Sequence, residues 1–169
     1  MKKTFLYAVL VFTLAGLAAC NLAESTEEET SESSVMSSPQ DYFSSFLEGN
    51  IPAVRPESGN SFYITDLNMN SNEWDSYTVG EMLDLDNDGE DELILQGPYG
   101  GMFLDVLNEE IVVFAEGQGT ALQLSYVYED GVYWIEYSDT LHSGRHMYSY
   151  TRYEGSDTVV ESYQDIIEE

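Results

Sequence analysis

The sequence of 169 residues has little cysteine and little positive charge. Its one cysteine is Cys20, so there is no second cysteine for a disulfide or for a zinc–thiolate site. From Cys20 onward there is no lysine, and three arginines stand against 32 acidic residues, a formal charge of −29. Such a surface repels nucleic acid and anionic lipid headgroups and attracts cations and basic proteins. Solubility at a cell surface is the simpler explanation of the same charge.

Catalytic motifs are missing as well. The sequence contains no G-x-S-x-G, H-E-x-x-H or phosphate-binding loop. Ser143 beside His142 does not make a triad, and with so many acids a pair of carboxylates at glycosidase spacing arises by chance. We therefore predict that the protein is not an enzyme. A glycoside hydrolase with an acidic pair is the least favoured of three functional alternatives.

The first twenty residues have the pattern of an export signal. Two lysines near the start precede an apolar run that is too short for a mature membrane span. Leu17-Ala18-Ala19-Cys20 then matches a bacterial lipobox, in which the cysteine is lipidated and becomes the new N-terminus. We predict a signal peptide over residues 1–19 and anchoring, through the lipid on Cys20, to the outer face of the cytoplasmic membrane. An ordinary secretory signal and an uncleaved anchor are the alternatives.

The exported part divides into a tether and one domain. Residues 20–39 are rich in serine, threonine and glutamate and predict a disordered, extended tether. Residues 40–169 are long enough for a single globular domain with its own core. Gln40–Gly49 predicts a short helix, capped by Ser38 or Asp41. The prolines that follow predict an irregular connection around Arg55.

From Phe62 onward the apolar residues repeat with a period of two, which is typical of strands. The connections are too short for parallel crossovers. We therefore predict a mainly β fold: an antiparallel meander, either a sandwich or a single strongly twisted sheet, with one short N-terminal helix. The candidate strands are Phe62–Leu67, Tyr77–Asp84, Glu92–Gln96, Met102–Leu107, Ile111–Ala115, Ala121–Tyr128, Val132–Tyr137, Met147–Tyr153 and Thr158–Tyr163.

Residues 84–95 carry the strongest chemical signal. Carboxylates stand at positions 1, 3, 5 and 9 of this stretch and a glycine at position 6: Asp84, Asp86, Asp88, Glu92 and Gly89. Glycine permits a sharp turn with positive φ, and a hard cation such as Ca²⁺ binds six to eight oxygens arranged in this way. An EF-hand would need a glutamate at position 12, where Leu95 stands in a candidate strand. The stretch therefore predicts an ion in a strand–loop–strand.

The pattern resembles the DxDxDG loop of FG-GAP and VCBS-type repeats. That resemblance implies a structural calcium ion held by the side chains of Asp84, Asp86, Asp88 and Glu92 and by the carbonyl of Glu90. The loop occurs once, so a propeller built from such repeats is not predicted. With its helix and tyrosine-rich meander, the chain also resembles small surface lipoproteins of Firmicutes of unknown function. An acidic turn that binds nothing tightly is the alternative.

Two other stretches have weaker metal-binding patterns. Asp66–Asn72 repeats the 1, 3, 5 spacing but lacks the glycine, which predicts either a degenerate second loop or an asparagine-rich turn. His142 and His146 are too few for a catalytic zinc site, and we expect them in a turn or at a strand end. Arg145 and Arg152 are expected to pair with carboxylates.

Thirteen tyrosines give the last functional signal. Aromatic rings on one face of a sheet can stack on sugars, and they are also ordinary half-buried strand residues. The candidates for stacking are Tyr133, Tyr137, Tyr148 and Tyr150. The leading hypothesis is a non-catalytic binding or scaffold protein with structural calcium, whose partner is a glycan or a basic surface protein. A carbohydrate-binding module is the alternative.

Overall fold

The computed structural model describes residues 36–141 and 144–168. The predicted signal peptide, Cys20, His142 and most of the predicted tether lie outside the described residues. Within the described ranges, no helix is long and apolar enough to cross a membrane. The elements in chain order are α1 (Pro39–Leu47), β1 (Ala53–Arg55), β2 (Asn60–Phe62), η1 (Ile64–Asp66), β3 (Thr78–Leu83), β4 (Glu92–Gln96), η2 (Pro98–Gly100), β5 (Met102–Leu107), β6 (Glu110–Glu116), β7 (Gln123–Glu129), β8 (Val132–Leu141), β9 (Arg145–Tyr153) and β10 (Val159–Glu168).

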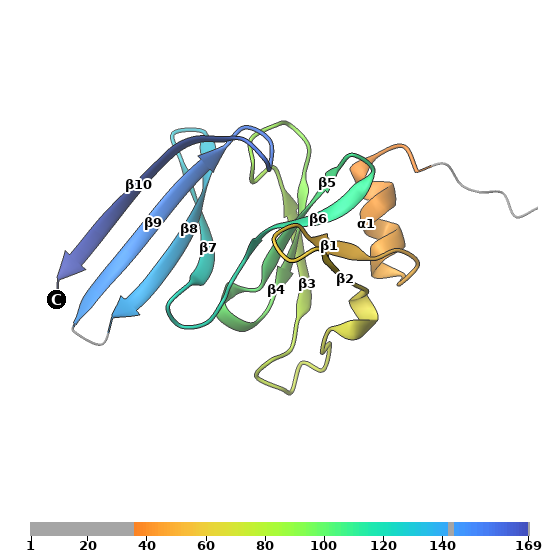
Figure 1. Ribbon diagram of the computed structural model, residues 1–169, viewed down its shortest axis with the longest axis horizontal. Coiled ribbons are helices and arrows are strands. Elements are labelled where there is room, and N and C mark those ends of the chain that lie inside the picture. Colours follow the sequence, from red (N-terminus) through yellow and green to blue (C-terminus); the bar gives the residue numbers. More distant parts are fainter. Residues whose placement is uncertain (1–35, 142–143, 169) are drawn as a thin grey trace, which may run out of the picture. The chain divides into compact units, whose positions relative to one another are not determined.

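The strands form two sheets (Figure 1). The first sheet has the order β2-β1-β6-β5-β4-β3 and the second has the order β10-β9-β8-β7. Neighbouring strands are antiparallel except β1 and β6, which run parallel through Ala53 and Val54. The mainly β prediction is therefore confirmed, and of the two architectures left open the one with two sheets is correct.

The helix α1 begins where the sequence predicts a cap. The Ser38 hydroxyl accepts a hydrogen bond from the Asp41 N–H at 3.4 Å, and the Asp41 carboxylate accepts one from the Ser38 N–H at 3.0 Å. This capping box satisfies backbone donors that the first helical turn leaves unpaired. Phe43 and Phe46 lie buried on one stripe of the helix. Gly49, with φ of 80°, follows the last turn.

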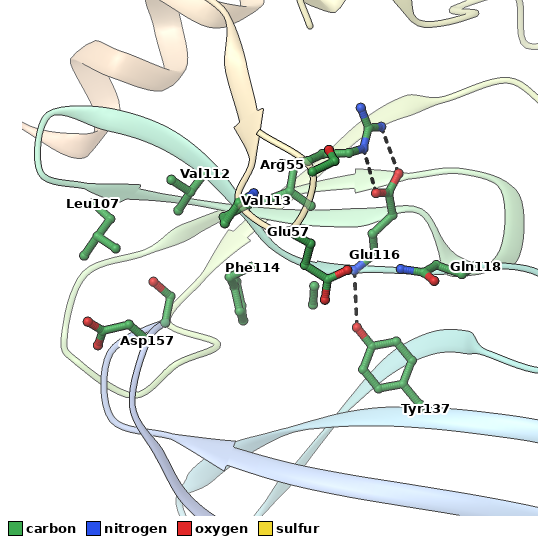
Figure 2. Close-up of a pocket in the computed structure, with 14 residues that line it drawn as sticks. Arg55, Glu57, Leu107, Val112, Val113, Phe114, Glu116, Gln118, Tyr137 and Asp157 are labelled. Atoms are coloured by element: carbon green, nitrogen blue, oxygen red, sulfur yellow. Dashed lines mark hydrogen bonds and ion pairs between the residues drawn. The ribbon is translucent and has the colours of Figure 1, made fainter. Parts of the chain in front are cut away.

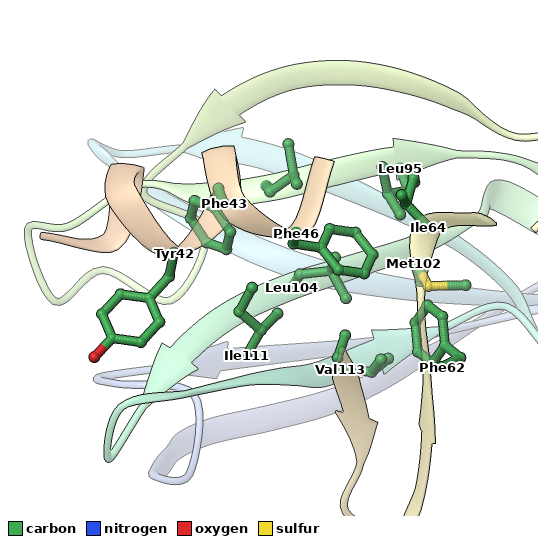
Figure 3. Close-up of a cluster of buried hydrophobic side chains, with 12 residues drawn as sticks. Tyr42, Phe43, Phe46, Phe62, Ile64, Leu95, Met102, Leu104, Ile111 and Val113 are labelled. Carbon is green, nitrogen blue, oxygen red and sulfur yellow. The ribbon is translucent and has the colours of Figure 1, made fainter. Parts of the chain in front are cut away.

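The first sheet is covered on both faces. The helix packs on one face around a core of twelve residues (Figure 3): Tyr42, Phe43, Phe46, Ala53, Phe62, Ile64, Leu93, Leu95, Met102, Leu104, Ile111 and Val113. The second sheet packs on the other face, around Leu85, Ile94, Phe103, Ala115, Leu124 and Ile135. Leu93 and Leu95 point to the helix and Ile94 to the second sheet, because side chains alternate along a strand.

The predicted strand Phe62–Leu67 is wrong, and the short strands β1 and β2 were missed. After Phe62 the chain turns into η1 instead of continuing as a strand over Phe62–Leu67, and the Asp66 carboxylate accepts the Tyr63 N–H at 2.8 Å. The connection predicted around Arg55 contains β1, because its two flanking prolines lie outside the short strand and remove none of its donors.

The C-terminal strands are longer than predicted. β8 runs to Leu141, β9 begins at Arg145 and β10 runs to Glu168. These extensions carry alternating polar residues and weak apolar periodicity, so the sequence underestimates them. At the other end, Met36 already packs against the core beneath α1, so the folded region starts a few residues before residue 40.

Candidate functional site

The acidic loop, residues 84–92, connects β3 to β4 as the strand–loop–strand prediction requires. Its turn passes through Gly89, whose φ of 97° lies in the left-handed region that favours glycine. The register pairs Leu83 with Glu92, so the two ends of the loop are held side by side in the sheet. The predicted ligands therefore come from one short hairpin connection.

The predicted carboxylates converge in this loop. Asp84, Asp86 and Asp88 each offer an oxygen within 4.8 Å of the other two. Asp86 and Glu92 are fully buried, Asp84 is half-buried and Asp88 is exposed. One buried oxygen on each of three residues has no hydrogen-bond partner: Oδ1 of Asp84, Oδ2 of Asp86 and Oε1 of Glu92. Buried acceptors without partners are costly, and a hard cation would satisfy them.

Glu92, Asp86 and Asp88 each have one carboxylate oxygen held by the backbone. Glu92 Oε2 accepts the N–H groups of Leu85 and Asp86, at 2.5 and 3.1 Å. Asp86 Oδ1 accepts the Asp88 N–H at 3.2 Å, and Asp88 Oδ1 accepts the Glu90 N–H at 2.8 Å. These bonds fix each carboxylate by one oxygen and leave the other free to bind an ion. The proposed role of the Glu90 carbonyl as a ligand stays a prediction.

A fifth carboxylate, Asp105 on β5, was not singled out from the sequence. It is 7% exposed, and one of its oxygens lies within 4.8 Å of oxygens of Asp86 and Glu92. The β4–β5 register places Glu92 and Asp105 one step beyond the last pair, facing each other across the two strands. Asp105 is the one charged residue in an otherwise apolar strand, and that was the signal available in the sequence.

Crowding of these carboxylates raises two pKa values. Burial raises the pKa of Asp86 to about 7, with Asp88 and Asp105 adding repulsion. Burial raises the pKa of Glu92 to about 9, again with repulsion from Asp86 and Asp105. Without a cation, Asp86 and Glu92 therefore bind protons near neutral pH. A bound divalent cation would stabilise the charged forms instead.

The acidic loop also joins the first sheet to the second. Asn87, with φ of 62°, accepts the Tyr133 N–H at 2.7 Å and donates to the carbonyls of Tyr133 and Tyr153 at 3.1 and 3.2 Å. The Gly155 N–H donates to the Asp86 carbonyl at 3.2 Å. Both ends of one asparagine amide are therefore used to hold β8 and β9. Any ion that orders this loop also orders the joint between the sheets.

A cleft of about 500 Å³ lies beside this joint (Figure 2). At one end, the Arg55 guanidinium donates twice to the Glu116 carboxylate, at 2.8 and 2.9 Å. On the opposite wall, the Tyr137 hydroxyl accepts the Glu116 N–H at 3.3 Å. Ser156 lines the cleft and donates to Asp105 Oδ2 at 2.5 Å. One wall of the cleft is thus hydrogen-bonded to Asp105, one of the clustered carboxylates.

The four tyrosines predicted to stack on a ligand do not share one face. Tyr133 and Tyr137 pack against the core between the sheets, so the prediction of a stacking role is wrong for these two. The Tyr137 hydroxyl also accepts a hydrogen bond from the first sheet, as described above. Tyr148 and Tyr150 lie on the opposite face of the second sheet, on alternate residues of β9. Side chains alternate between the two faces of a strand, so a shift of one residue moves a tyrosine from the core face to the outer face.

Tyr148 and Tyr150 belong to a larger aromatic group, which we call the outer aromatic row: His146, Tyr148, Tyr150 and Tyr163. Neighbouring rings in it are nearly parallel, with interplanar angles of 24°, 18° and 23°. Trp134 stands edge-on to Tyr163 at 5.4 Å between ring centroids. Trp134, Tyr150 and Tyr163 also line a shallow hollow of about 210 Å³. Whether the rings of this row stack on a ligand stays a prediction.

The second loop with alternating polar residues, which we call the asparagine loop, covers residues 66–75. Asn68 donates through Nδ2 to the carboxylates of Glu73 and Asp75, both at 2.8 Å. Asn70 donates to the other oxygen of Glu73, also at 2.8 Å. The acids of this loop are therefore satisfied by its own amides. The structure favours the asparagine-rich turn over a second ion site within Asp66–Asn72.

The two C-terminal arginines pair with acids, as predicted. Arg145 lies 3.0 Å from the Glu168 carboxylate, and Arg152 lies 3.5 Å from that of Glu161. All four residues are on the adjacent strands β9 and β10. His146 is the second residue of β9, at a strand end, which is one of the two places expected for it.

No family model matches this chain, and no curated protein or solved structure matches it. Its own residues define it as a mainly β protein of two sheets, with a cluster of carboxylates at the joint between them. The likeness of the acidic loop to FG-GAP and VCBS-type repeats stays a prediction from the sequence.

Proposed function

We propose that the protein is a non-catalytic binding or scaffold protein in which a structural calcium ion holds the two sheets together. The supporting observation is the set of three buried carboxylate oxygens without partners, on Asp84, Asp86 and Glu92. Asp86 offers ligand oxygens near those of two pairs of acids, Asp84 with Asp88 and Glu92 with Asp105. An all-oxygen site with several carboxylates suits Ca²⁺, which accepts flexible geometry. We expect binding in the weak extracellular range, about 10⁻⁴–10⁻³ M.

The structural role follows from where the loop is attached. An ion bound by residues 84–92 would draw the acidic side chains inward and fix the backbone around Asn87. Asn87 carries three hydrogen bonds to the second sheet, and the Asp86 carbonyl carries one more. Calcium would therefore set the position of β8 and β9 relative to the first sheet, and with them the cleft and the outer aromatic row.

Burial of the acids supports a non-catalytic role. A glycosidase places its two carboxyl groups on either side of a bound sugar linkage, in a cleft that admits the substrate. Asp86 and Glu92 are fully buried and Asp105 is nearly so. Their carboxylates are therefore closed to a polysaccharide chain.

Thermal unfolding with and without calcium tests the proposal. A ligand that binds only the folded state raises the melting temperature, and calcium at about one to ten times Kd adds about 0.4–1.4 kcal/mol. Asp86→Asn should abolish the shift. Asp91→Asn is the matched control, because it removes the same charge from an exposed residue of the same loop. An unchanged melting temperature for the wild-type protein in millimolar calcium would sink the proposal.

The lipid anchor is part of the same proposal and has a separate test. Cys20→Ser removes the thiol that the lipobox pattern marks for lipidation. We expect the unsubstituted protein in the membrane fraction, labelled by a fatty-acid analogue, and the variant unlabelled and released. A variant that stays with the membrane would favour the uncleaved anchor.

A second candidate function, carbohydrate binding, is favoured by the outer aromatic row. Its near-parallel rings and the hollow beside Trp134 offer surface on which a sugar could stack. Glycan-array binding lost in Trp134→Ala and Tyr163→Ala would support it. Trp74→Ala is the control, because Trp74 is 80% exposed and lies in the asparagine loop. Equal loss in all three variants, or no binding to any glycan, would count against this function.

A further inference from the structure

Strand β10 forms an exposed edge of the second sheet. It pairs with β9 on one side and has no neighbouring strand on the other among the described residues (Figure 1). All ten of its residues are exposed, and five of them are large and apolar: Val159, Val160, Tyr163, Ile166 and Ile167. Proteins usually shield such an edge, because its unpaired N–H and C=O groups can accept another strand. β10 is thus a surface on which strand addition is favourable.

The acids of β10 are partly balanced by arginines on the neighbouring strand. Arg145 and Arg152, two of the three arginines in the sequence, lie on β9 and pair with Glu168 and Glu161 of β10. A chain with a charge of −29 after Cys20 repels a copy of itself over most of its surface. At this edge the two arginines offset two of the three acids of β10, which reduces the repulsion between two copies.

We propose that β10 pairs antiparallel with β10 of a second copy of this chain. Identical antiparallel strands are related by a two-fold axis, so one residue faces itself. The two registers with the longest overlap centre on Tyr163 or on Gln164. The first places Glu161 opposite Asp165, which is destabilising. The second places Glu161 opposite Ile167 and Asp165 opposite Tyr163, so no two acids of β10 face each other, and it is the register we assign.

This pairing uses only the second sheet and does not rest on the calcium ion. It would join the two second sheets through their β10 edges and bring the two outer aromatic rows onto one continuous surface. The competing occupant is a basic extended segment of another protein. Salt separates the two cases, because screening relieves repulsion between acidic copies and weakens attraction to a basic segment.

Sedimentation of the full chain in a neutral detergent, over a range of concentrations, tests the pairing. We expect a concentration-dependent dimer that is tighter at about 0.5 M than at about 0.05 M salt. Ile167→Glu should weaken it roughly tenfold, because symmetry sets two new Glu–Glu oppositions across the edge. Val159→Glu is the matched control: it also replaces an exposed apolar residue of β10, yet faces no residue of the strand in this register.

Ile167→Lys separates charge from lost apolar contact, since it places a base opposite Glu161 and should keep the dimer. Circular dichroism of each variant checks that the fold is intact. A monomer at every concentration overturns the proposal, and so does equal weakening by the two glutamate variants. Association that is unchanged by all three substitutions would be due to the lipid and would overturn it as well.

Discussion

Two loops of this protein share a spacing and differ in chemistry. The acidic loop has carboxylates at its first, third and fifth positions, and the asparagine loop has Asp66, Asn68 and Asn70 there. In the asparagine loop, amide groups donate to the neighbouring acids, so the loop is closed by its own hydrogen bonds. In the acidic loop, backbone N–H groups donate to some carboxylate oxygens, but one buried oxygen each of Asp84, Asp86 and Glu92 has no donor. The proposed calcium ion would satisfy these oxygens, as the amides do in the asparagine loop.

The two loops also differ in what they hold. The asparagine loop bonds to itself and to the adjacent residues 63, 64 and 77, whereas the acidic loop reaches the second sheet through Asn87 and the Asp86 carbonyl. Loss of order in the acidic loop would therefore also reduce the order of β8 and β9. Loss of order in the asparagine loop would stay local.

The largest difference in unfolding free energy is expected when one acid is removed from each loop, Glu92 from the acidic loop and Asp66 from the asparagine loop. Glu92→Ala leaves the buried Asp86 N–H without an acceptor, removes one of the two acceptors of the Leu85 N–H and opens a cavity, so it should cost about 3–5 kcal/mol. Asp66→Ala loses one exposed bond from the Tyr63 N–H and should cost about 1 kcal/mol. Chemical denaturation in calcium measures both. Equal costs would show that the acidic loop is not special.

The pH dependence of the calcium-free protein should reveal the crowded carboxylates. In the folded protein the pKa of Asp86 is raised from 3.8 to about 7 and that of Glu92 from 4.5 to about 9. A raised acid pKa stabilises the folded state below the unfolded pKa, and this stability is lost as pH rises through the folded pKa. We expect the free energy of unfolding to fall by several kcal/mol as the pH rises from 4 to 9.

Two controls sharpen the pH prediction. Saturating calcium should flatten the profile, because the cation replaces the protons, and Glu92→Gln should flatten it in part. Asp66→Asn should leave it as in the wild-type protein. A calcium-free profile that rises with pH over this range would contradict the assigned crowding.

The joint between the sheets provides a comparison of two asparagines. Asn87→Ala removes three hydrogen bonds to Tyr133 and Tyr153 and should cost about 1–3 kcal/mol. Hydrogen exchange should speed up in β8 and β9 in this variant. Asn70→Ala, at an exposed residue, should cost less than about 1 kcal/mol and leave exchange in those strands unchanged. Equal exchange in both variants would argue against the joint.

The smallest expected effect changes sign with calcium. Asp88 is exposed and repels Asp86. Asp88→Asn should therefore stabilise the calcium-free protein slightly, within about 0.5 kcal/mol, and weaken calcium binding about tenfold. Melting temperatures measured at several calcium concentrations would test this, because the values for the variant and for the wild-type protein should cross as calcium increases. A variant that is less stable in both conditions would indicate a structural role for Asp88 instead.

The sequence predicted the strands where packing is strictly alternating or fully apolar. β4 and β5 have the predicted bounds, because both faces of the first sheet are buried and the apolar run is continuous. β1 and η1 were not predicted, because short elements between prolines and turn residues carry too few apolar positions to show a period. The single parallel pair, β1 with β6, depends on contacts distant in sequence.

The same limit applies to the candidate site. The loop ligands are adjacent in sequence, so their spacing alone brought Asp84, Asp86 and Asp88 together as predicted. Asp105 joins them only through the β4–β5 register, which a strand pattern does not specify. The split of the tyrosines between the two faces depends on strand phase, and a shift by one residue exchanges the faces.

Calorimetric titration of calcium into the purified protein tests the central claim most directly. We expect one ion per chain for the wild-type protein and for Asp66→Asn, with a Kd of about 10⁻⁴–10⁻³ M. Asp86→Asn should bind none in that range. No binding by the wild-type protein, or equal binding by Asp86→Asn, would contradict the account of the acidic loop.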